Sequence, residues 1–180
     1  MLIINGGYIN FQEYNENLAI RLKEILLSDD EDIMIGVPIA IKSTKGYNKI
    51  AKEFWKQNMD TGRMHWKKYC KKKKIYCNTN MTRLFRDYED KSNSIRWFKN
   101  FKQIWNDKDI LLIEGSKSKL GINNDLFSNA KSVERIIAPS KNAFDKYDEI
   151  LAVIKERCKG KLVLLSLGPT ATVLAYDLCK

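Results

Sequence analysis

The stretch Asp109-Ile-Leu-Leu-Ile-Glu114 is an unbroken apolar run that ends in a carboxylate, and it decides the fold. A run of this kind is typical of a strand that is covered on both faces, as in a parallel sheet. Two further strands are predicted at Arg135-Ile-Ile-Ala138, stopped by Pro139, and at Lys161-Leu-Val-Leu-Leu-Ser-Leu167. Each strand is expected to pass through a loop into a helix, with Ser140 as the cap of the second helix. The segment therefore predicts three successive strand–loop–helix units.

Apolar residues at helical spacing and two short apolar runs precede this segment. The helices that they predict are 14–27, 48–59 and 94–105, and the strands are 33–37 and 75–78. Ile95, Phe98, Phe101 and Trp105 are expected to form the buried stripe of the third helix. The alternation of strands and helices predicts one α/β domain over residues 1–180, with a mostly parallel sheet.

The chain has 180 residues and a formal net charge of +10. Such an excess of cations suits nucleic acid, an anionic membrane surface or a nucleotide-activated substrate, and a lysine-rich solvated surface explains it equally well. No apolar run has membrane-spanning length, and the four cysteines lack zinc-ligand spacing. Scattered cysteines without a secretion signal predict reduced thiols in a cytoplasmic protein.

The turn Gly168-Pro-Thr-Ala-Thr172 is a candidate anion site, because it joins a predicted strand to a helix. Ligands of open α/β sheets lie beyond the carboxyl ends of the strands, and helix starts favour anions. The turn lacks the spacing of a P-loop or a dinucleotide fingerprint, and helix capping alone also explains it. The loop Glu114–Asp125 and the pair Thr82-Arg83 are further candidates. A phosphate-bearing substrate is therefore the first functional expectation.

A basic and aromatic segment in the middle of the chain points to a different function. Trp66 and Tyr69 accompany the lysines of Lys67–Lys74, a combination that also occurs on surfaces that bind nucleic acid. The alternative is a solvated charged face, which is the commoner role of such runs, so nucleic acid is not the expected partner. His65 is the only histidine, which excludes a metal site built from several histidines.

Several segments together resemble the GT-D glycosyltransferase family, bacterial enzymes first described as a domain of unknown function. The likeness extends over nearly the whole chain, and its last two segments are long enough to be specific. The segments are Phe11-Gln-Glu-Tyr14, Leu18-Ala19, Thr82-Arg83, Ile104-Trp105, Ile113-Glu-Gly115, Leu120-Gly-Ile-Asn-Asn-Asp-Leu-Phe127, Arg135-Ile-Ile-Ala-Pro-Ser-Lys-Asn-Ala-Phe144 and Leu167-Gly-Pro-Thr-Ala-Thr-Val-Leu-Ala-Tyr-Asp-Leu178.

The resemblance implies a Rossmann-like, three-layer α/β domain that transfers a hexose, typically glucose, from a nucleotide sugar such as UDP-glucose. The implied acceptor is a glycan on a glycoprotein or polysaccharide. Strand-end placement and the resemblance together give the candidate donor-binding residues Arg83, Glu114, Lys119, Gly121, Asn124, Asp125, Asn142, Gly168, Pro169, Thr170 and Thr172. Among these, the cations are expected to offset phosphate charge, and the Asn and Asp side chains to bond sugar or ribose hydroxyls.

The resemblance also implies a divalent metal, manganese or magnesium, bound through an Asp-x-Glu motif beside the diphosphate. Family members usually carry a Gly-Asp-Gly-Glu segment just before the position of Leu2, and they continue past Lys180. We therefore expect the metal ligands and the catalytic base outside these residues, in a domain truncated at both ends. Lys119 stands where the family commonly has Arg, which keeps the charge but loses the bidentate fork.

Other hypotheses stay open beside the glycosyltransferase. The chain could be a basic module that binds nucleic acid or another anionic polymer. It could also be an inactive structural partner of a fuller enzyme. An unfinished sheet edge further predicts pairing with a second copy of the chain.

Overall fold

Residues 10–83 and 85–180 are described by a computed structural model, apart from the side chains of residues 60, 61, 63, 65 and 67. The chain divides into two compact units. The sheet unit joins the N-terminal segment up to Glu24 with Lys102–Lys180, and the insert unit is Ile25–Phe101. The sequence shows no convincing linker at either boundary, and the single domain over residues 1–180 stays a prediction.

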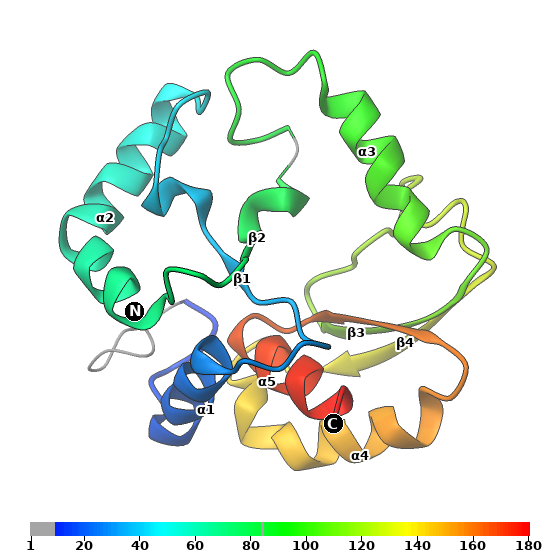
Figure 1. Cartoon of the computed structure of the whole chain (residues 1–180). Coiled ribbons are helices and arrows are strands. Elements are labelled where there is room, and N and C mark those ends of the chain that lie inside the picture. The colour runs from blue at the N-terminus through cyan, green and yellow to red at the C-terminus, as the bar shows by residue number, and fades with distance from the viewer. Residues whose placement is uncertain (1–9, 84) are drawn as a thin grey trace. The chain divides into compact units, whose positions relative to one another are not determined.

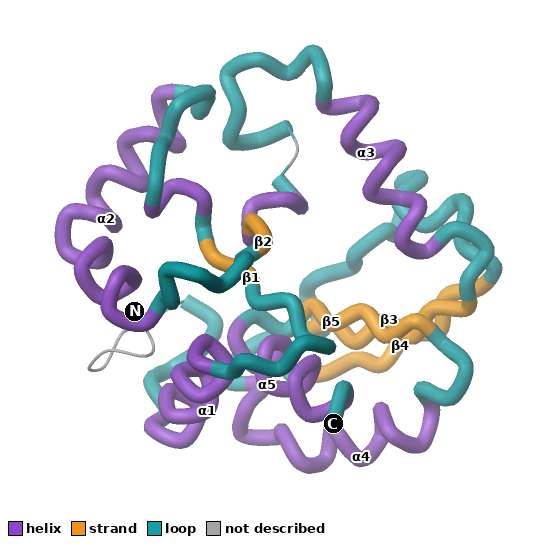
Figure 2. Tube along the Cα trace, in the orientation of Figure 1, coloured by secondary structure: helices purple, strands orange, loops and turns teal. Residues whose placement is uncertain are grey.

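The sheet unit is built on three parallel strands, β3 (Asp109–Gly115), β4 (Ser132–Ala138) and β5 (Leu162–Ser166). Their order is β4-β3-β5, so the strand predicted from the unbroken apolar run is the central one (Figure 2). Ile113 of β3 lies opposite Ile136 and Leu165 of its two neighbours. The predicted parallel α/β arrangement is therefore confirmed.

Helices cover the sheet, chiefly α4 (Tyr147–Arg157) and α5 (Pro169–Leu178), which lie on one side of the strands (Figure 1). Leu111 and Ile113 of β3 belong to the same buried core as Ile150, Ile154 and Leu174 of these helices. Side chains alternate along a strand, so the neighbouring positions 110 and 112 face the other way. They too are fully buried. Both faces of the central strand are therefore covered, as a three-layer fold requires.

α1 (Glu16–Leu27) is confirmed nearly as predicted, and its last residues fall in the insert unit. Arg21 of α1 donates a hydrogen bond to Asp177 of α5 at 2.5 Å, and Tyr147 of α4 donates to the same carboxylate. Burial, reinforced by that carboxylate, raises the pKa of Tyr147. This shared acceptor ties α1, α4 and α5 together within the sheet unit.

The helix predicted after the first strand is absent, which corrects the expected strand–loop–helix unit. Residues 116–131 form successive turns, with positive φ at Lys119, Gly121 and Asn123. Glycine and asparagine tolerate that left-handed conformation, whereas a helix requires negative φ throughout. The expected cap at Ser140 is also wrong, because the next helical turn, the 3₁₀ turn Ala143–Lys146, begins after Asn142 and has no side-chain cap bond.

The insert unit holds α2 (Lys49–Tyr69), α3 (Ser94–Lys102) and a short parallel pair, β1 (Gly36–Val37) with β2 (Cys77–Asn78). Asn48 caps α2 by accepting a hydrogen bond from Ala51 N at 2.9 Å, and the helix runs ten residues beyond its predicted end. Short 3₁₀ turns lie at Ile39–Ile41 and Thr79–Thr82 in this unit and at Gln103–Trp105 in the sheet unit.

The buried stripe predicted for α3 is only partly confirmed. Ile95 is 74% exposed and Phe98 is 37% exposed, whereas Trp105, just beyond the helix, is buried. Amphipathic spacing alone does not decide which apolar side chains find partners, because burial depends on what packs against the helix. Among the described residues, no helix combines the length and the apolar character that a membrane crossing demands.

Candidate functional site

A cavity of about 340 Å³ lies where the three parallel strands of the sheet unit end. The strand ends contribute Gly115, Pro139, Ser140, Ser166, Leu167 and Gly168 to its lining. The remaining lining residues are Phe11, Gln12, Lys117, Ser118 and Ala143. Parallel strands place their carboxyl ends at one edge of a sheet, and open α/β sheets bind ligands there. This cavity is therefore the candidate site.

Gly168 stands at the junction between β5 and α5 and faces the cavity. Its φ of 56° belongs to the region that favours glycine, and a Cβ at this position would overlap the ring of Phe11. Pro169 occupies the first helical position, where the missing N–H costs nothing. Ala171 N already donates to Gly168 O at 3.1 Å, and the dipole of the helix favours an anion near Gly168.

The two threonines of this turn occupy different environments. Thr170 is fully buried, and its hydroxyl has no hydrogen-bond partner among the described residues. Thr172 is exposed on the first turn of α5. Neither threonine lines the cavity, and Gly168 is the residue of this turn that does.

Glu114, at the end of β3, is 1% exposed and fully engaged by the protein. Leu120 N donates to its Oε2 at 2.7 Å, and Arg135 donates to its Oε1. Arg135 also donates to Leu120 O at 2.7 Å. Burial opposes ionisation of Glu114, but the bonds from Leu120, Ser118 and Arg135 outweigh it and lower the pKa of the carboxyl. Glu114 therefore anchors the loop that presents Lys117 and Ser118 to the cavity.

Lys119 and Gly121 shape that loop. Both have positive φ, of 50° and 73°, and the Lys119 side chain is exposed. A Cβ at Gly121 would overlap the ring of Phe127, so glycine is needed there for the aromatic side chain to pack. Neither residue lines the cavity.

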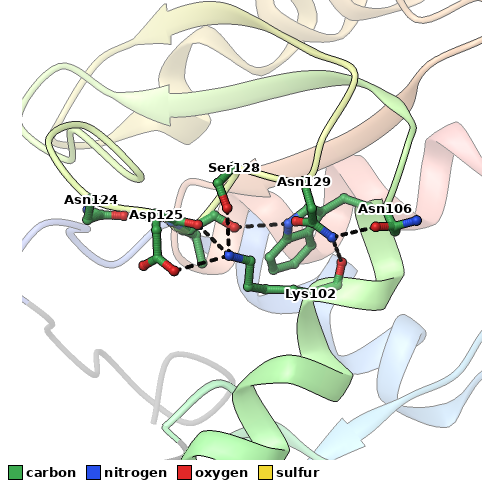
Figure 3. A network of polar contacts seen from close by, with 8 residues as sticks. Lys102, Asn106, Asn124, Asp125, Ser128 and Asn129 are labelled. Atoms are coloured by element: carbon green, nitrogen blue, oxygen red, sulfur yellow. Dashed lines mark hydrogen bonds and ion pairs between the residues drawn. The ribbon is translucent and has the colours of Figure 1, made fainter.

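Asn124 and Asp125 take part in a polar network that fixes the far end of the same loop (Figure 3). Lys102 Nζ donates to Asp125 O at 2.6 Å, to Asp125 Oδ2 at 3.2 Å and to Ser128 Oγ at 2.9 Å. Asn124 Oδ1 accepts from Leu126 N at 3.0 Å, and Asn129 donates to Lys102 O at 2.9 Å. The network ties the loop to the end of α3, so these two predicted site residues do not reach the cavity.

Asn142 fastens the N-terminal segment to the loop after β4. Its backbone N donates to Phe11 O at 2.9 Å, and its Oδ1 accepts from Glu13 N at 2.9 Å. The residue has a φ of 49°, which asparagine tolerates better than most residues. The two bonds hold Phe11 and Gln12 where they line the cavity.

Arg83 belongs to the insert unit and pairs with Asp87, with 3.6 Å between Nη1 and Oδ2. In the lysine cluster of that unit, Lys71 pairs with Asp29, and Lys74 donates to Ser28 O. The side chains of His65 and Lys67 lie outside the described residues.

The expected metal does not find its ligands in the cavity. Within residues 10–83 and 85–180, no group of three or more His, Cys, Asp or Glu side chains could hold a metal ion. The cavity lining contains no carboxylate or imidazole, and its single charged side chain is Lys117. The described residues thus do not fit a metal site, and no catalytic base is assigned among them.

Of the predicted site residues, the structure brings Gly168 to the cavity, while Glu114 and Asn142 hold segments that line it. The predicted donor-binding residues did not include Lys117 and Ser118, although both lie in the candidate loop Glu114–Asp125, and they did not include Ser140 and Ser166. The strand-end rule that found Gly168 could have found them, because each stands at or just after the carboxyl end of a strand. The strand-end rule could not have found Phe11 and Gln12, because both precede the three strands of this sheet in the sequence.

The model of the family described as "Glycosyltransferase GT-D fold" matches residues 1–180. Among curated proteins, the chain is 38% identical over 179 residues to the probable glycosyl transferase Gly of Streptococcus gordonii, covering 99% of the chain and 26% of that protein. It is 36% identical over 179 residues to the glycosyltransferase GlyD of Streptococcus pneumoniae serotype 4 (strain ATCC BAA-334 / TIGR4), covering 99% of the chain and 22% of that protein.

Solved structures give the same result. A domain of unknown function 1792, described as having a distinct glycosyltransferase fold, matches with a TM-score of 0.91 and 39% identity, over 99% of the chain and 64% of that structure. A glycosyltransferase of this domain type from Streptococcus sanguinis matches with a TM-score of 0.94 and 37% identity, over 99% and 66%. The chain thus spans about a quarter of the curated relatives and just under two thirds of the solved ones.

Proposed function

The chain belongs to the glycosyltransferase GT-D fold family, and on that premise we propose that it transfers a hexose, with glucose as the expected sugar, from a nucleotide sugar such as UDP-glucose. The proposed acceptor is a glycan on a glycoprotein or polysaccharide. One observation supports the donor site more than any other. The cavity lies at the joint carboxyl edge of β3, β4 and β5 and includes the glycine that begins α5.

The diphosphate of the donor is proposed to bind at the start of α5. The helix dipole and the amides at a helix start favour negative charge there, and the missing side chain of Gly168 leaves room for the ring of Phe11 in the cavity wall. Lys117 lines the same cavity and has no ion pair among the described residues, so its ammonium is available to offset phosphate charge. These groups bind and orient the donor.

The leaving nucleoside diphosphate carries most of the charge that develops during transfer. Amides that are already oriented by the fold stabilise such charge without reorganising, which is the general advantage of a prebuilt electrostatic site. The carboxylate of Glu114 acts indirectly, because it holds the loop that carries Lys117 and Ser118. Its two oxygens are engaged within the protein, so we propose that it orients this loop and makes no contact with the sugar.

A divalent metal, manganese or magnesium, stays part of the proposal because diphosphate leaving groups are commonly neutralised by one. The residues that line the cavity supply no ligand for it, so no step is assigned to the metal here. A cytoplasmic location is proposed from the four free thiols, which suit a reducing compartment. Pairing with a second copy stays a prediction.

The proposal is tested by isothermal calorimetry of this chain with UDP, UDP-glucose and GDP-mannose, each with magnesium or manganese. We expect UDP and UDP-glucose to bind and GDP-mannose to bind at least tenfold more weakly. A radiolabelled transfer assay, with the Streptococcus gordonii relative as the positive control, then asks whether the chain transfers glucose. Absence of UDP binding with either metal would contradict the proposed donor site.

A further inference from the structure

We propose that residues 11–13 form a strap that recognises the nucleobase of the donor, with the base stacked on Phe11 and hydrogen-bonded to Gln12. Asn142 is the positioning residue that holds this strap. The inference rests on the proposed function, because it needs a nucleotide in the cavity, and it adds which part of the nucleotide the strap selects.

Phe11 has the position and the exposure that a stacking residue needs. It lines the cavity, and its ring lies directly against Gly168, where the diphosphate is proposed to bind. Its side chain is 47% exposed although an apolar ring gains by burial. A flat group that covers the ring would remove that surface from water. Aromatic side chains stack on bases in many nucleotide sites.

Gln12 adds a polar contact beside the ring. It is 3% exposed and lines the same cavity. Its Nε2 donates to Glu13 O at 3.1 Å, and because a carbonyl needs a donor, this bond fixes which end of the amide is the nitrogen. The remaining Oε1 receives no hydrogen bond from the described residues. An acceptor of this kind in the cavity lining favours a ligand that carries an N–H.

The N–H of a uracil ring matches that acceptor, whereas the corresponding nitrogen of cytosine is itself an acceptor. Two acceptors that face each other repel and leave both without a donor. The strap therefore favours a uridine over a cytidine nucleotide, and this preference depends on Gln12 being held in place.

Asn142 holds the strap through two bonds at 2.9 Å, one from its own N to Phe11 O and one from Glu13 N to its Oδ1. The sequence-based prediction gave Asn142 a direct bond to sugar or ribose hydroxyls. The proposal replaces that role with an indirect one, since the side-chain oxygen is already occupied by Glu13. Its left-handed φ of 49° makes a glycine substitution free of backbone strain.

The first test measures the affinity of the chain for UDP, CDP and inorganic diphosphate by calorimetry with magnesium present. Wild type is expected to prefer UDP to CDP by about tenfold. Phe11→Leu is expected to weaken UDP by about tenfold and to leave diphosphate unchanged, and Phe11→Tyr to retain UDP binding because it keeps the ring. Equal UDP affinity in wild type and Phe11→Leu overturns the proposal.

The second test separates positioning from stability. Asn142→Gly keeps the backbone conformation and removes the bond to Glu13, whereas Asn142→Asp keeps an acceptor in place. We expect Asn142→Gly to lose most of the preference for UDP over CDP at an unchanged Tm, and Asn142→Asp to restore it. A lower Tm with an unchanged preference would overturn the positioning role.

The two failures are distinguishable. If wild type binds neither UDP nor diphosphate, the proposed donor site is wrong and the strap has no ligand. If wild type binds UDP and CDP equally, the donor site stands and base recognition by the strap is wrong.

Discussion

Each of the two units buries a carboxylate, and the two carboxylates are held in different ways. In the sheet unit, Glu114 accepts hydrogen bonds from Leu120 N and Arg135 and is 1% exposed. In the insert unit, Asp87 is 5% exposed, but its Oδ2 has no hydrogen bond from the part of the chain that the structure describes and stands 3.6 Å from the half-exposed Arg83. A buried charge is stabilising only where its lone pairs are satisfied. The buried carboxylate of the sheet unit therefore anchors a loop through hydrogen bonds, whereas the buried carboxylate of the insert unit does not.

The charges of the two units differ as well. The insert unit, Ile25–Phe101, contains seventeen Lys and Arg against nine Asp and Glu, a net charge of +8. The rest of the chain contains fifteen against thirteen, a net charge of +2. Most of the positive charge that suggested a polyanion in the sequence therefore lies outside the unit that carries the cavity.

The largest effect is expected from Glu114→Gln. The substitution removes the negative charge beside Arg135 and one of the two side-chain oxygens that accept hydrogen bonds. The free energy of unfolding should therefore fall by about 2–4 kcal/mol. Asp87→Asn in the insert unit is the matched control and should change it by about 1 kcal/mol or less, because its partner is exposed. Urea unfolding measures both. Equal losses would remove the distinction between the two units.

The pH dependence of stability follows from the lowered pKa of Glu114. A carboxyl whose pKa is lower in the folded than in the unfolded chain stabilises the fold at pH values above its unfolded pKa, about 4.3. That contribution is lost as the pH falls from there through the lowered folded pKa. Wild type should therefore lose stability across this acidic window, and Glu114→Gln should lose less. Parallel pH profiles for the two proteins would contradict the assignment.

Gly168→Ala should have the next largest effect, this time on ligand binding. The added Cβ must displace the Phe11 ring from the cavity wall, so UDP affinity should fall by at least tenfold, or about 1.4 kcal/mol. Gly160→Ala is the control, because Gly160 also has a positive φ, of 73°, but no atom stands within 4 Å of the position of its Cβ. It should lose stability by about 1 kcal/mol and keep UDP affinity. Calorimetry and thermal melts distinguish the two changes.

Arg83→Ala tests the one predicted donor ligand that lies in the insert unit. The sequence-based prediction requires donor affinity to fall several-fold, since a guanidinium that meets a phosphate contributes charge-assisted hydrogen bonds. Stability should change little, because Arg83 itself is half-exposed and its Nη1 stands 3.6 Å from Asp87 Oδ2. Calorimetry with UDP-glucose and manganese measures the affinity. Unchanged binding would remove Arg83 from the site.

The smallest effect is expected from Lys72→Gln with Lys73→Gln in the insert unit. Both lysines are without an ion pair among the described residues, so their removal should lower salt-dependent retention on DNA or RNA about two- to threefold and leave UDP affinity unchanged. Lys155→Gln with Lys159→Gln in the sheet unit makes the same change in net charge. Equal effects of the two pairs would show that retention follows overall charge alone and would argue against a polyanion site at Lys67–Lys74.

The sequence predicted the three parallel strands well, because hydrophobic patterning is a local signal. Gly168-Pro169 is also a local signal, and it predicted the turn that begins α5. The sequence-based prediction was wrong where the position of a segment depends on contacts with distant residues. Asn124 and Asp125 have the side chains of sugar ligands, and nothing local shows that Lys102 occupies one of them. The prediction of a helix after β3 was wrong for a similar reason, because a turn-rich loop that is hydrogen-bonded to Glu114 stands in its place.

The chain's order of residues by itself determined the strands, the glycine at the start of α5 and, through its motifs, the family. Only the folded chain decided that Phe11 and Gln12 belong to the same cavity as Gly168, 157 residues later, and that Asn142 holds them there. The physical reason is the range of the forces involved. Backbone preference and apolar periodicity act over a few residues, whereas a cavity wall and its hydrogen bonds exist only once distant segments have been packed together.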